Sequence, residues 1–521
     1  MKDTIIILGA GVMQGPAIRI AKELGLHAIA LDASAKAPCV SMADQFEQID
    51  LKDKEGIETF ARSLQSTGIK LGIMTAGTDF SASVAWVAER LALPGIPYSA
   101  ALNASDKSRM RECFKKASLP SPNFITITEA DKFENIPPFP LVIKPVDNMG
   151  SRGCRRVDTI EELREASKTA IGFSRSGRAI VESYMEGPEF SVDAIVYKGE
   201  ITICGLADRH IFFPPYFIEM GHTMPTVIEE EKQQSLLDTF RAGIHALGLA
   251  GNESIGAAKG DIKLTARGPM IGEIAARLSG GYMSGWTYPY SSGVEPIRAA
   301  ILSAMGRKPD ALTTTKKWTC AERAFISIPG TVKEIYGVDK ARSLPHVNDL
   351  FLRIAKGDKV SFPENNVTKC GNIIASAQDR DTAMQAAESA VRSVLIKLDP
   401  SDRQTADFLS NRGSAFPPDA FTLNSELKAE LAQIPDFQPE KNSGVYSIYP
   451  FPAFSSSALK DYMGRTVEEA LSAVRLLTGF SLPNASENAD NRIILGCSFW
   501  RALIRGSYQG AIHYIENLGV K

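Results

Sequence analysis

Short aliphatic runs alternate with amphipathic helical segments through residues 1–105, and this alternation constrains the fold more than any other feature. The run TIIILGAG predicts a buried strand, GPAIRIAKELG predicts a helix that ends at Gly25, and HAIALD predicts a second strand. Strand–helix–strand repeats of this length favour right-handed crossovers and a parallel sheet with helices on both faces. We therefore predict an α/β domain with a parallel sheet over residues 1–105.

A glycine-containing turn follows the first predicted strand. Gly9 and Gly11 are followed by Gly15, which gives G-x-G-x-x-x-G, one residue longer than the dinucleotide fingerprint G-x-G-x-x-G. We interpret this turn as a tight connection between strand and helix. A nicotinamide dehydrogenase built on it is the least favoured of the hypotheses that we retain.

The composition excludes several classes of protein. The 521 residues predict three or four domains, at roughly 150 residues each. With 58 Lys+Arg against 60 Asp+Glu, the net charge of -2 argues against a protein that coats nucleic acid or an anionic membrane. The seven cysteines are scattered without a C-x-x-C pair, and no apolar run approaches the roughly 20 residues of a membrane-spanning helix. We expect a cytoplasmic protein with no nucleic-acid or membrane partner.

After residue 105 the pattern changes from strand–helix alternation to antiparallel hairpins. This pattern predicts an α+β domain over residues 106–310. Three strands and the long helix DTAMQAAESAVRSVLIKL predict a small α+β domain over residues 311–400. Residues 401–521 begin with stretches rich in Pro, Ser and Asn and later contain one clear helical pattern, TVEEALSAVRLLTG. We treat them as an accessory region.

The segment KGDIKLTARGPMIGEIAARLSGG, residues 259–281, predicts two strands that place carboxylates face to face. A three-residue loop over residues 266–268 sets Asp261 opposite Glu273, with Cβ atoms roughly 4.5–5.5 Å apart. Like charges at that distance repel unless a cation lies between them, and oxygen ligands without Cys or His favour Mg²⁺. By itself, this spacing is more typical of a solvated strand face on which each acid pairs with its own Lys or Arg.

Three further segments carry side chains suited to a nucleotide. Lys144 ends the apolar strand PLVIK, just before the small-residue loop 147–153, whose backbone N–H groups could approach phosphate oxygens. Lys107 lies in the first turn of a predicted helix, where the N–H groups and the helix dipole favour anions. Glu182 and Glu189 flank a bend that could meet an adenine and a ribose. Each feature alone is also typical of a surface lysine, a turn or a solvated glutamate.

The order of these segments resembles the ATP-grasp ligases. The segments are DKSRMR, VIKP with DNMGSRG, VESYMEGPEFSV, and GDIKLT followed by GEIAARLSGG. The resemblance covers roughly residues 1–400 and is strongest to the carboxylate–amine ligase branch, which includes L-amino-acid ligases and carbamoyl-phosphate synthetase-like proteins. It implies a Rossmann-like pre-ATP-grasp domain over residues 1–105 and an ATP-grasp domain over residues 106–310. It also implies ATP and Mg²⁺ as cofactors.

The resemblance implies a nucleotide role for two lysines and one loop. Lys107 and Lys144 would hold the ATP phosphates, and loop 147–153, with Ser151 and Gly153, would form a mobile lid over them. The implied contacts to adenine and ribose come from Glu182, Tyr184, Met185 and Glu189.

The resemblance also implies the metal and acyl sites. Asp261 and Glu273 would bind Mg²⁺, and Arg277 would stabilise the acyl phosphate and the tetrahedral species formed from it. Ala275 replaces the asparagine that usually binds metal in this family, so a second Mg²⁺ would need water or phosphate ligands. The acyl substrate would be lined by Ser279, Gly280 and Gly281.

A second substrate is expected near FFPPYFIEMGHTMP, which lies between the nucleotide glutamates and the metal hairpin. Arg209, Glu219 and His222 could bind the carboxylate or the ammonium group of an amino acid. A lone histidine is more often structural than a ligand. Thr78 and Asp79 follow a strand of the first domain, and we expect them to face the same cleft.

We therefore predict an ATP-dependent ligase that joins a small carboxylate to an amine, with an amino acid as a substrate. In the implied reaction the carboxylate is phosphorylated, and the amine then displaces phosphate to give amide, ADP and phosphate. Two alternatives stay open. One is a bicarbonate- or formate-activating enzyme of purine type, and the other, suggested by Ala275, is a nucleotide-binding scaffold without turnover. The expected partners are small molecules, and a homodimer is allowed.

Overall fold

The computed structural model describes residues 2–130, 132–310, 312–411, 416–436, 446–485 and 493–518. The chain forms two compact units. Unit 1 comprises residues 1–322 and 376–384, and unit 2 comprises residues 323–375 and 385–521. Elements at the boundaries between the units are β14 (Thr319–Phe325), β18 (Gly371–Ala377) and α11 (Arg380–Ser393). No helix within the described residues is long and apolar enough to cross a membrane.

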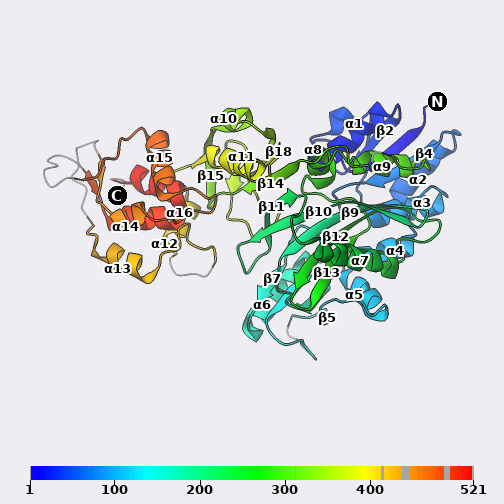
Figure 1. Ribbon diagram of the computed structural model, residues 1–521, viewed down its shortest axis with the longest axis horizontal. Helices are drawn as coiled ribbons and strands as arrows, with labels where there is room; N and C mark the ends of the chain where they lie inside the picture. The colour runs from blue at the N-terminus through cyan, green and yellow to red at the C-terminus, as the bar shows by residue number, and fades with distance from the viewer. Residues whose placement is uncertain are drawn as a thin grey trace. The chain divides into compact units, whose positions relative to one another are not determined.

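Unit 1 begins with a four-stranded parallel sheet in the order β3-β2-β1-β4 (Figure 1). Ile5 and Ile7 of β1 point into one apolar core, whereas Ile6 and Leu8 point into another, because helices cover both faces. This arrangement confirms the predicted α/β domain. Its elements are β1 (Thr4–Leu8), η1 (Val12–Gln14), α1 (Gly15–Glu23), β2 (His27–Asp32), η2 (Val40–Met42), β3 (Gln45–Gln48), α2 (Lys54–Gln65), β4 (Leu71–Thr75), α3 (Ser81–Arg90) and α4 (Tyr98–Ser105).

The glycine turn after β1 is filled by a side chain of the same turn. Gly9 has φ +103°, and a Cβ atom built there would lie 2.9 Å from the side chain of Gln14. The Gln14 amide accepts a hydrogen bond from the Gly11 N–H at 3.0 Å and donates one to the Ala76 carbonyl. These contacts agree with a tight connection between strand and helix.

A small antiparallel sheet follows in the order β5-β8-β6-β7, with α6 packed on it. β6 ends beside the glycine loop, residues 147–153, and β7 begins directly after that loop. The sheet therefore holds both ends of the predicted lid. The elements of this part are α5 (Lys107–Lys116), β5 (Phe124–Ile127), β6 (Leu141–Pro145), β7 (Arg155–Val157), α6 (Ile160–Phe173) and β8 (Ala179–Ser183).

The larger sheet of unit 1 has the strand order β13-β12-β9-β10-β11. Helix α7 packs against β12 and β13 (Figure 1). Its Phe240 and Ile244 side chains are fully buried there. The two faces of β9 and β12 contact different cores, since Val192 and Ala258 lie in one core and Ile195 and Ala257 in the other. The elements are β9 (Glu189–Tyr197), β10 (Glu200–Phe212), β11 (Ile218–Met224), α7 (Glu230–Leu247), β12 (Ile255–Thr265), β13 (Gly268–Ala275), η3 (Met283–Thr287), α8 (Tyr288–Ser291) and α9 (Pro296–Ala304).

Unit 2 combines a three-stranded sheet, β17-β15-β19, with helices from the C-terminal part of the chain. Residues on both sides of the boundary predicted at position 400 belong to this unit, and α16 packs against β19 and α12. The predicted boundary itself stays a prediction. The elements are β15 (Gly330–Tyr336), α10 (Val338–Ser343), β16 (Val347–Leu352), β17 (Lys359–Val360), β19 (Leu395–Leu398), α12 (Arg403–Ser410), α13 (Ser425–Gln433), β20 (Tyr446–Ile448), α14 (Pro452–Ser455), α15 (Val467–Thr478), β21 (Ile493–Leu495) and α16 (Cys497–Glu516).

Candidate active site

The β12–β13 hairpin places Asp261 directly opposite Glu273, as predicted, but through a different turn. Thr265 pairs with Gly268, so the connection is a two-residue turn rather than the expected three-residue loop. The register then shifts by one residue at Gly272, next to Asp261. The shorter turn and the bulge compensate for each other, so the two carboxylates still face each other.

The carboxylate of Asp261 is buried among cations. It accepts a hydrogen bond from Ser191 Oγ at 2.7 Å and forms ion pairs with Arg209, at 3.0 Å, and with Lys259. Burial alone would raise the pKa of Asp261, but Arg209 and Lys259 outweigh this effect and lower it to about 2. Asp261 is therefore ionised at every physiological pH.

Glu273 lies beside the first predicted phosphate lysine. Lys107 Nζ is 3.2 Å from Glu273 Oε1 and donates a hydrogen bond to the carbonyl of Asn148, in the glycine loop, at 2.8 Å. Burial alone would lower the pKa of Lys107, but Glu273 and Asp79 raise it. Lys107 thus links the predicted metal carboxylate to the predicted lid, and Asp79 of the first domain is near enough to influence its charge. That Asp79 faces a substrate cleft stays a prediction.

The second phosphate lysine, Lys144, belongs to a buried ion triad. Lys144 Nζ is 2.8 Å from Glu182 Oε2, and Arg111 Nε donates to Glu182 Oε1 at 2.7 Å. Arg111 also donates to the carbonyls of Ile271 and Gly272, at 3.0 and 2.6 Å, immediately before Glu273. Burial raises the pKa of Glu182, but Arg111 and Lys144 outweigh it and lower the pKa to about 2. Both Glu182 oxygens are therefore engaged by cations, and its adenine contact stays a prediction.

Arg111 is a residue of this cluster that the sequence reasoning missed. It follows Lys107 by four residues on α5, so both side chains lie on the same helix face. That spacing was the available signal. The partners of Arg111, on β8 and β13, are 71 to 161 residues away in the chain, so the sequence did not reveal them.

The remaining nucleotide residues lie along one edge of the site. Lys263 Nζ donates to the Met185 carbonyl at 3.1 Å and lies 3.8 Å from Glu189 and 5.1 Å from the centre of the Tyr184 ring. In the glycine loop, Ser151 and Gly153 have positive φ values, +59° and +68°. The structure thus gathers the predicted adenine, ribose and phosphate residues, whose individual roles stay predictions.

The three predicted substrate residues lie together, and Arg209 links them to Asp261, one of the two predicted metal carboxylates. Arg209 forms ion pairs with Glu189, Glu219 and Asp261, so its charge is already shared among three carboxylates. His222 lies between two buried carboxylates, 3.5 Å from Glu219 and 3.3 Å from Glu322. Glu322 is a second residue that the sequence reasoning missed, because it lies 100 residues from His222 and in a different strand.

The loop after β13 carries the predicted acyl-site residues. Gly281 has φ +59°, and a Cβ atom there would lie 2.9 Å from Glu219 Oε1 and 3.3 Å from the His222 ring. Ser279 donates hydrogen bonds to buried Asp193. Arg277 Nε is buried and has no hydrogen-bond partner within the described part of the chain. The loop therefore borders the substrate cluster through Gly281.

The residues present suit Mg²⁺ held together with a phosphate, but not a metal centre built of protein ligands alone. No group of three or more His, Cys, Asp or Glu side chains that could hold a metal occurs among the residues that the structure describes. Asp261 and Glu273 supply two carboxylates, and Ala275 faces Lys259 in the register. Mg²⁺ usually takes one or two carboxylates and completes its shell with phosphate and water. Two carboxylates beside two phosphate lysines match that requirement.

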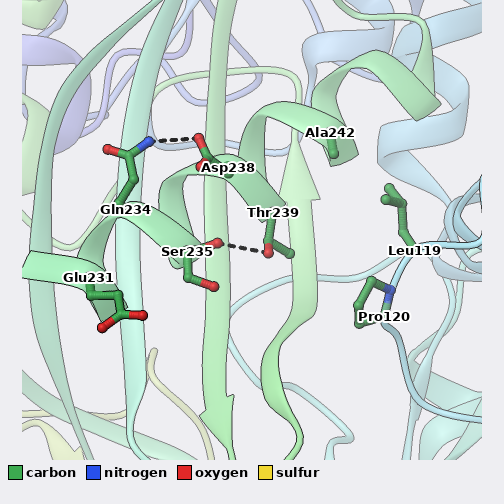
Figure 2. Close-up of a pocket in the computed structure, with 8 residues that line it drawn as sticks. All are labelled: Leu119, Pro120, Glu231, Gln234, Ser235, Asp238, Thr239 and Ala242. Carbon is green, nitrogen blue, oxygen red and sulfur yellow. Dashed lines mark hydrogen bonds between the residues drawn. The ribbon is translucent and has the colours of Figure 1, made fainter.

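An open groove of about 580 Å³ lies elsewhere on unit 1 and contains none of the predicted site residues (Figure 2). Its polar side chains bond to their own helix, as Gln234 donates to Asp238 and Thr239 donates to the Ser235 carbonyl. The groove is lined by Leu119, Pro120, Glu231, Gln234, Ser235, Asp238, Thr239 and Ala242.

Two family models match the chain in the regions just described. Residues 137–284 match the ATP-grasp domain, and residues 324–399 match the L-amino acid ligase C-terminal domain 2. Among solved structures, L-amino acid ligase from Bacillus licheniformis superposes with a TM-score of 0.66 at 20% identity, over 77% of this chain and 100% of that one. These findings confirm the predicted order of a parallel-sheet domain, an ATP-grasp domain and a C-terminal domain.

Curated relatives are similar at low identity. An uncharacterized protein of Sinorhizobium fredii is 24% identical over 394 residues, 74% of this chain and 80% of its own length. Carnosine synthase 1 of Gallus gallus is 24% identical over 335 residues, 59% of this chain but 36% of its own length. The match to the ATP-grasp domain confirms ATP and Mg²⁺ as the expected cofactors.

Proposed function

We propose, from the premise that this chain is an ATP-grasp ligase, that it activates the carboxylate of an amino acid as an acyl phosphate and joins it to an amine. The observation that carries this proposal is one cluster that joins Lys107, Lys144, Asp261 and Glu273 in unit 1. Two lysines and two facing carboxylates are what a triphosphate with Mg²⁺ requires.

The residues of the site position and neutralise charge rather than form covalent bonds. ATP with Mg²⁺ supplies the phosphoryl group that converts a carboxylate oxygen into a good leaving group. Lys107 and Lys144 would place positive charge at the phosphates, and the guanidinium of Arg277 would stabilise the developing oxyanion. The carboxylate and ATP give acyl phosphate and ADP. The amine then forms the C–N bond, phosphate leaves and a proton is released.

The substrate cluster supports an amino acid as a reactant. Glu219 and Glu322 flank His222, all three side chains are buried, and Glu219 and His222 lie beside Gly281. Buried carboxylates on both sides of a histidine favour a cationic group, such as the ammonium of an amino acid. The names of the similar L-amino acid ligase and carnosine synthase support the same class of substrate. Arg209 is less suited to a substrate carboxylate, since three protein carboxylates already surround it.

One assay separates this proposal from its alternatives. The full-length protein is incubated with ATP and Mg²⁺, and ADP release is measured with pairs of L-amino acids, with bicarbonate and with formate. We expect release with amino-acid pairs, together with a product whose mass equals the two amino acids less one water. Release only with bicarbonate or formate supports the purine-type alternative. ATP binding without ADP release under any of these mixtures supports the scaffold suggested by Ala275.

A further inference from the structure

Asp193 is a fully buried carboxylate that the proposed chemistry does not use. It lies on β9, opposite Lys259 of β12, with 0% of its surface exposed. Its backbone N–H donates to the hydroxyl of Tyr288 at 3.0 Å, and that hydroxyl donates to the Gly205 carbonyl at 3.2 Å. A buried carboxylate is costly unless its oxygens accept hydrogen bonds, so the groups that bond to it indicate its role.

The carboxylate of Asp193 is bonded to one residue of the acyl loop. Ser279 Oγ donates to Asp193 Oδ2 at 2.6 Å, and the Ser279 N–H lies 3.2 Å from both oxygens. Ser284 Oγ in turn donates to the Ser279 carbonyl at 2.7 Å. An ionised acceptor roughly doubles the strength of such bonds, so Asp193 is the strongest anchor of Ser279.

The loop that Asp193 anchors fits between two other parts of the site. On one side, the Gly77 N–H donates to the Leu278 carbonyl at 3.2 Å, and a Cβ atom built on Gly280 would lie 3.4 Å from Gly77 Cα. On the other side, a Cβ atom built on Gly281 would lie 2.9 Å from Glu219 Oε1. A small displacement of Ser279 would therefore move the loop against Gly77 or against the substrate cluster.

We propose that Asp193 is a positioning residue for the acyl substrate, because it fixes Ser279 and thereby places Gly280 and Gly281 at the substrate cluster. This inference rests on the proposed function. We expect Asp193 to affect the binding of the carboxylate substrate but not the binding of nucleotide, because its carboxylate accepts hydrogen bonds from the acyl loop.

Ionisation of Asp193 gives a second, independent readout. Burial raises its pKa to about 6, although Ser279, Lys259 and Arg277 oppose the effect of burial. The titratable and charged groups that face it are Lys259 on β12, Arg277 after β13, Tyr288 in α8 and Cys204 on β10. Protonation removes the charge that strengthens the bonds to Ser279, so the loop is held less firmly below about pH 6.

The test uses the full-length protein and the L-amino-acid pair that gives the fastest ADP release. D193N keeps the side-chain size but removes the charge, and S279A keeps the carboxylate and the N–H bond while removing the hydroxyl. We expect KM for the amino acid to rise at least tenfold in D193N and about threefold in S279A. The Kd for ADP with Mg²⁺ should stay within twofold in both.

In the wild type, KM for the amino acid should rise as pH falls through about 6, and this rise should be absent in D193N.

A matched control is available in unit 2, where Ser507 Oγ donates to buried Asp461 at 2.6 Å. S507A removes the same kind of bond and should leave KM for the amino acid unchanged. If the wild type is active and D193N and S279A keep its KM, Asp193 does not position the loop, although the proposed function stands. An equal loss of ADP affinity, or a pH-dependent rise that persists in D193N, also overturns the inference. A wild type that releases no ADP with any amino-acid pair overturns the proposed function and the inference with it.

Discussion

Both units bury charged side chains, but the two units satisfy them differently. In unit 1, Lys107 and Lys144 pair with carboxylates, and Glu273 keeps 35% of its side chain exposed. In unit 2, Arg465 donates to the carbonyls of Val391, Arg392 and Val394, at 3.4, 3.1 and 2.9 Å, and lies beside Asp461. The first cluster opens to ligands, whereas the second ties backbone segments together.

The choice of cation follows this difference. Arginine presents a planar set of donors that can hold several carbonyls at once, so it suits a permanent contact. Lysine is a compact charge on a flexible stem, and its pairing with a carboxylate can be exchanged for a phosphate. Burial of charge is therefore not by itself a sign of function.

The largest effect should come from removing a phosphate lysine. In K144A we expect loss of ATP binding and at least a hundredfold fall in turnover, since one such electrostatic contact contributes about 10²–10³ in rate. In E273A we expect ADP binding to persist while turnover falls by a similar factor. Calorimetric binding of ADP and steady-state ADP release measure the two quantities. Nucleotide affinity unchanged in K144A would contradict the assignment of Lys144.

The next effect tests the structural cluster of unit 2. R465M removes the donor to three carbonyls and leaves Asp461 buried without its cation. Breaking a buried ion pair costs about 3–5 kcal/mol of unfolding free energy. We expect that loss in urea titrations, with ADP affinity unchanged. A fall in ADP affinity without a loss of stability would place Arg465 with the functional residues and break the comparison.

Glu182 of unit 1 combines features of the two clusters, because it pairs both with a lysine, Lys144, and with an arginine, Arg111. Its pKa is lowered to about 2, so the ionised carboxylate contributes stability above pH 4.5 that is lost as pH falls from 4.5 through about 2. The shift corresponds to about 3 kcal/mol. E182Q should therefore be less stable than the wild type at pH 7, and the difference should shrink toward pH 2. Urea titrations at pH 7 and pH 3 measure this, and a difference that is constant with pH would refute it.

The hairpin shows how far the sequence predicted the site. The prediction that Asp261 faces Glu273 was confirmed, whereas the predicted three-residue loop was wrong. A bulge at Gly272 offsets the shorter turn, and no local pattern distinguishes these two routes to one register. Alternation and turn residues thus predicted which side chains meet across the hairpin, but not the backbone path that brings them together.

Contacts between distant segments were the least predictable part. The parallel sheet of residues 1–105 followed from local periodicity, because the strands β1 and β4 are buried on both faces. In contrast, the partners of Arg111 and Asp193 depend on how α5, β8, β9 and β13 pack, and these contacts span 71 to 161 residues. The sequence identifies such residues only as a helical arginine and a strand aspartate.

The smallest effect should come from an acidic residue outside both clusters. Asp238 lines the open groove on α7, where it accepts a hydrogen bond from Gln234 at 2.7 Å (Figure 2). It also accepts one from Arg241 at 3.0 Å. Its side chain is 62% exposed, so water solvates the charge whether or not these bonds form. D238N should change the unfolding free energy by no more than about 0.5 kcal/mol and leave turnover and ADP affinity unchanged. A larger loss of turnover would mean that solvated carboxylates of unit 1 also contribute to the site. A buried carboxylate paired with a lysine would then no longer be the feature that distinguishes site residues from surface residues.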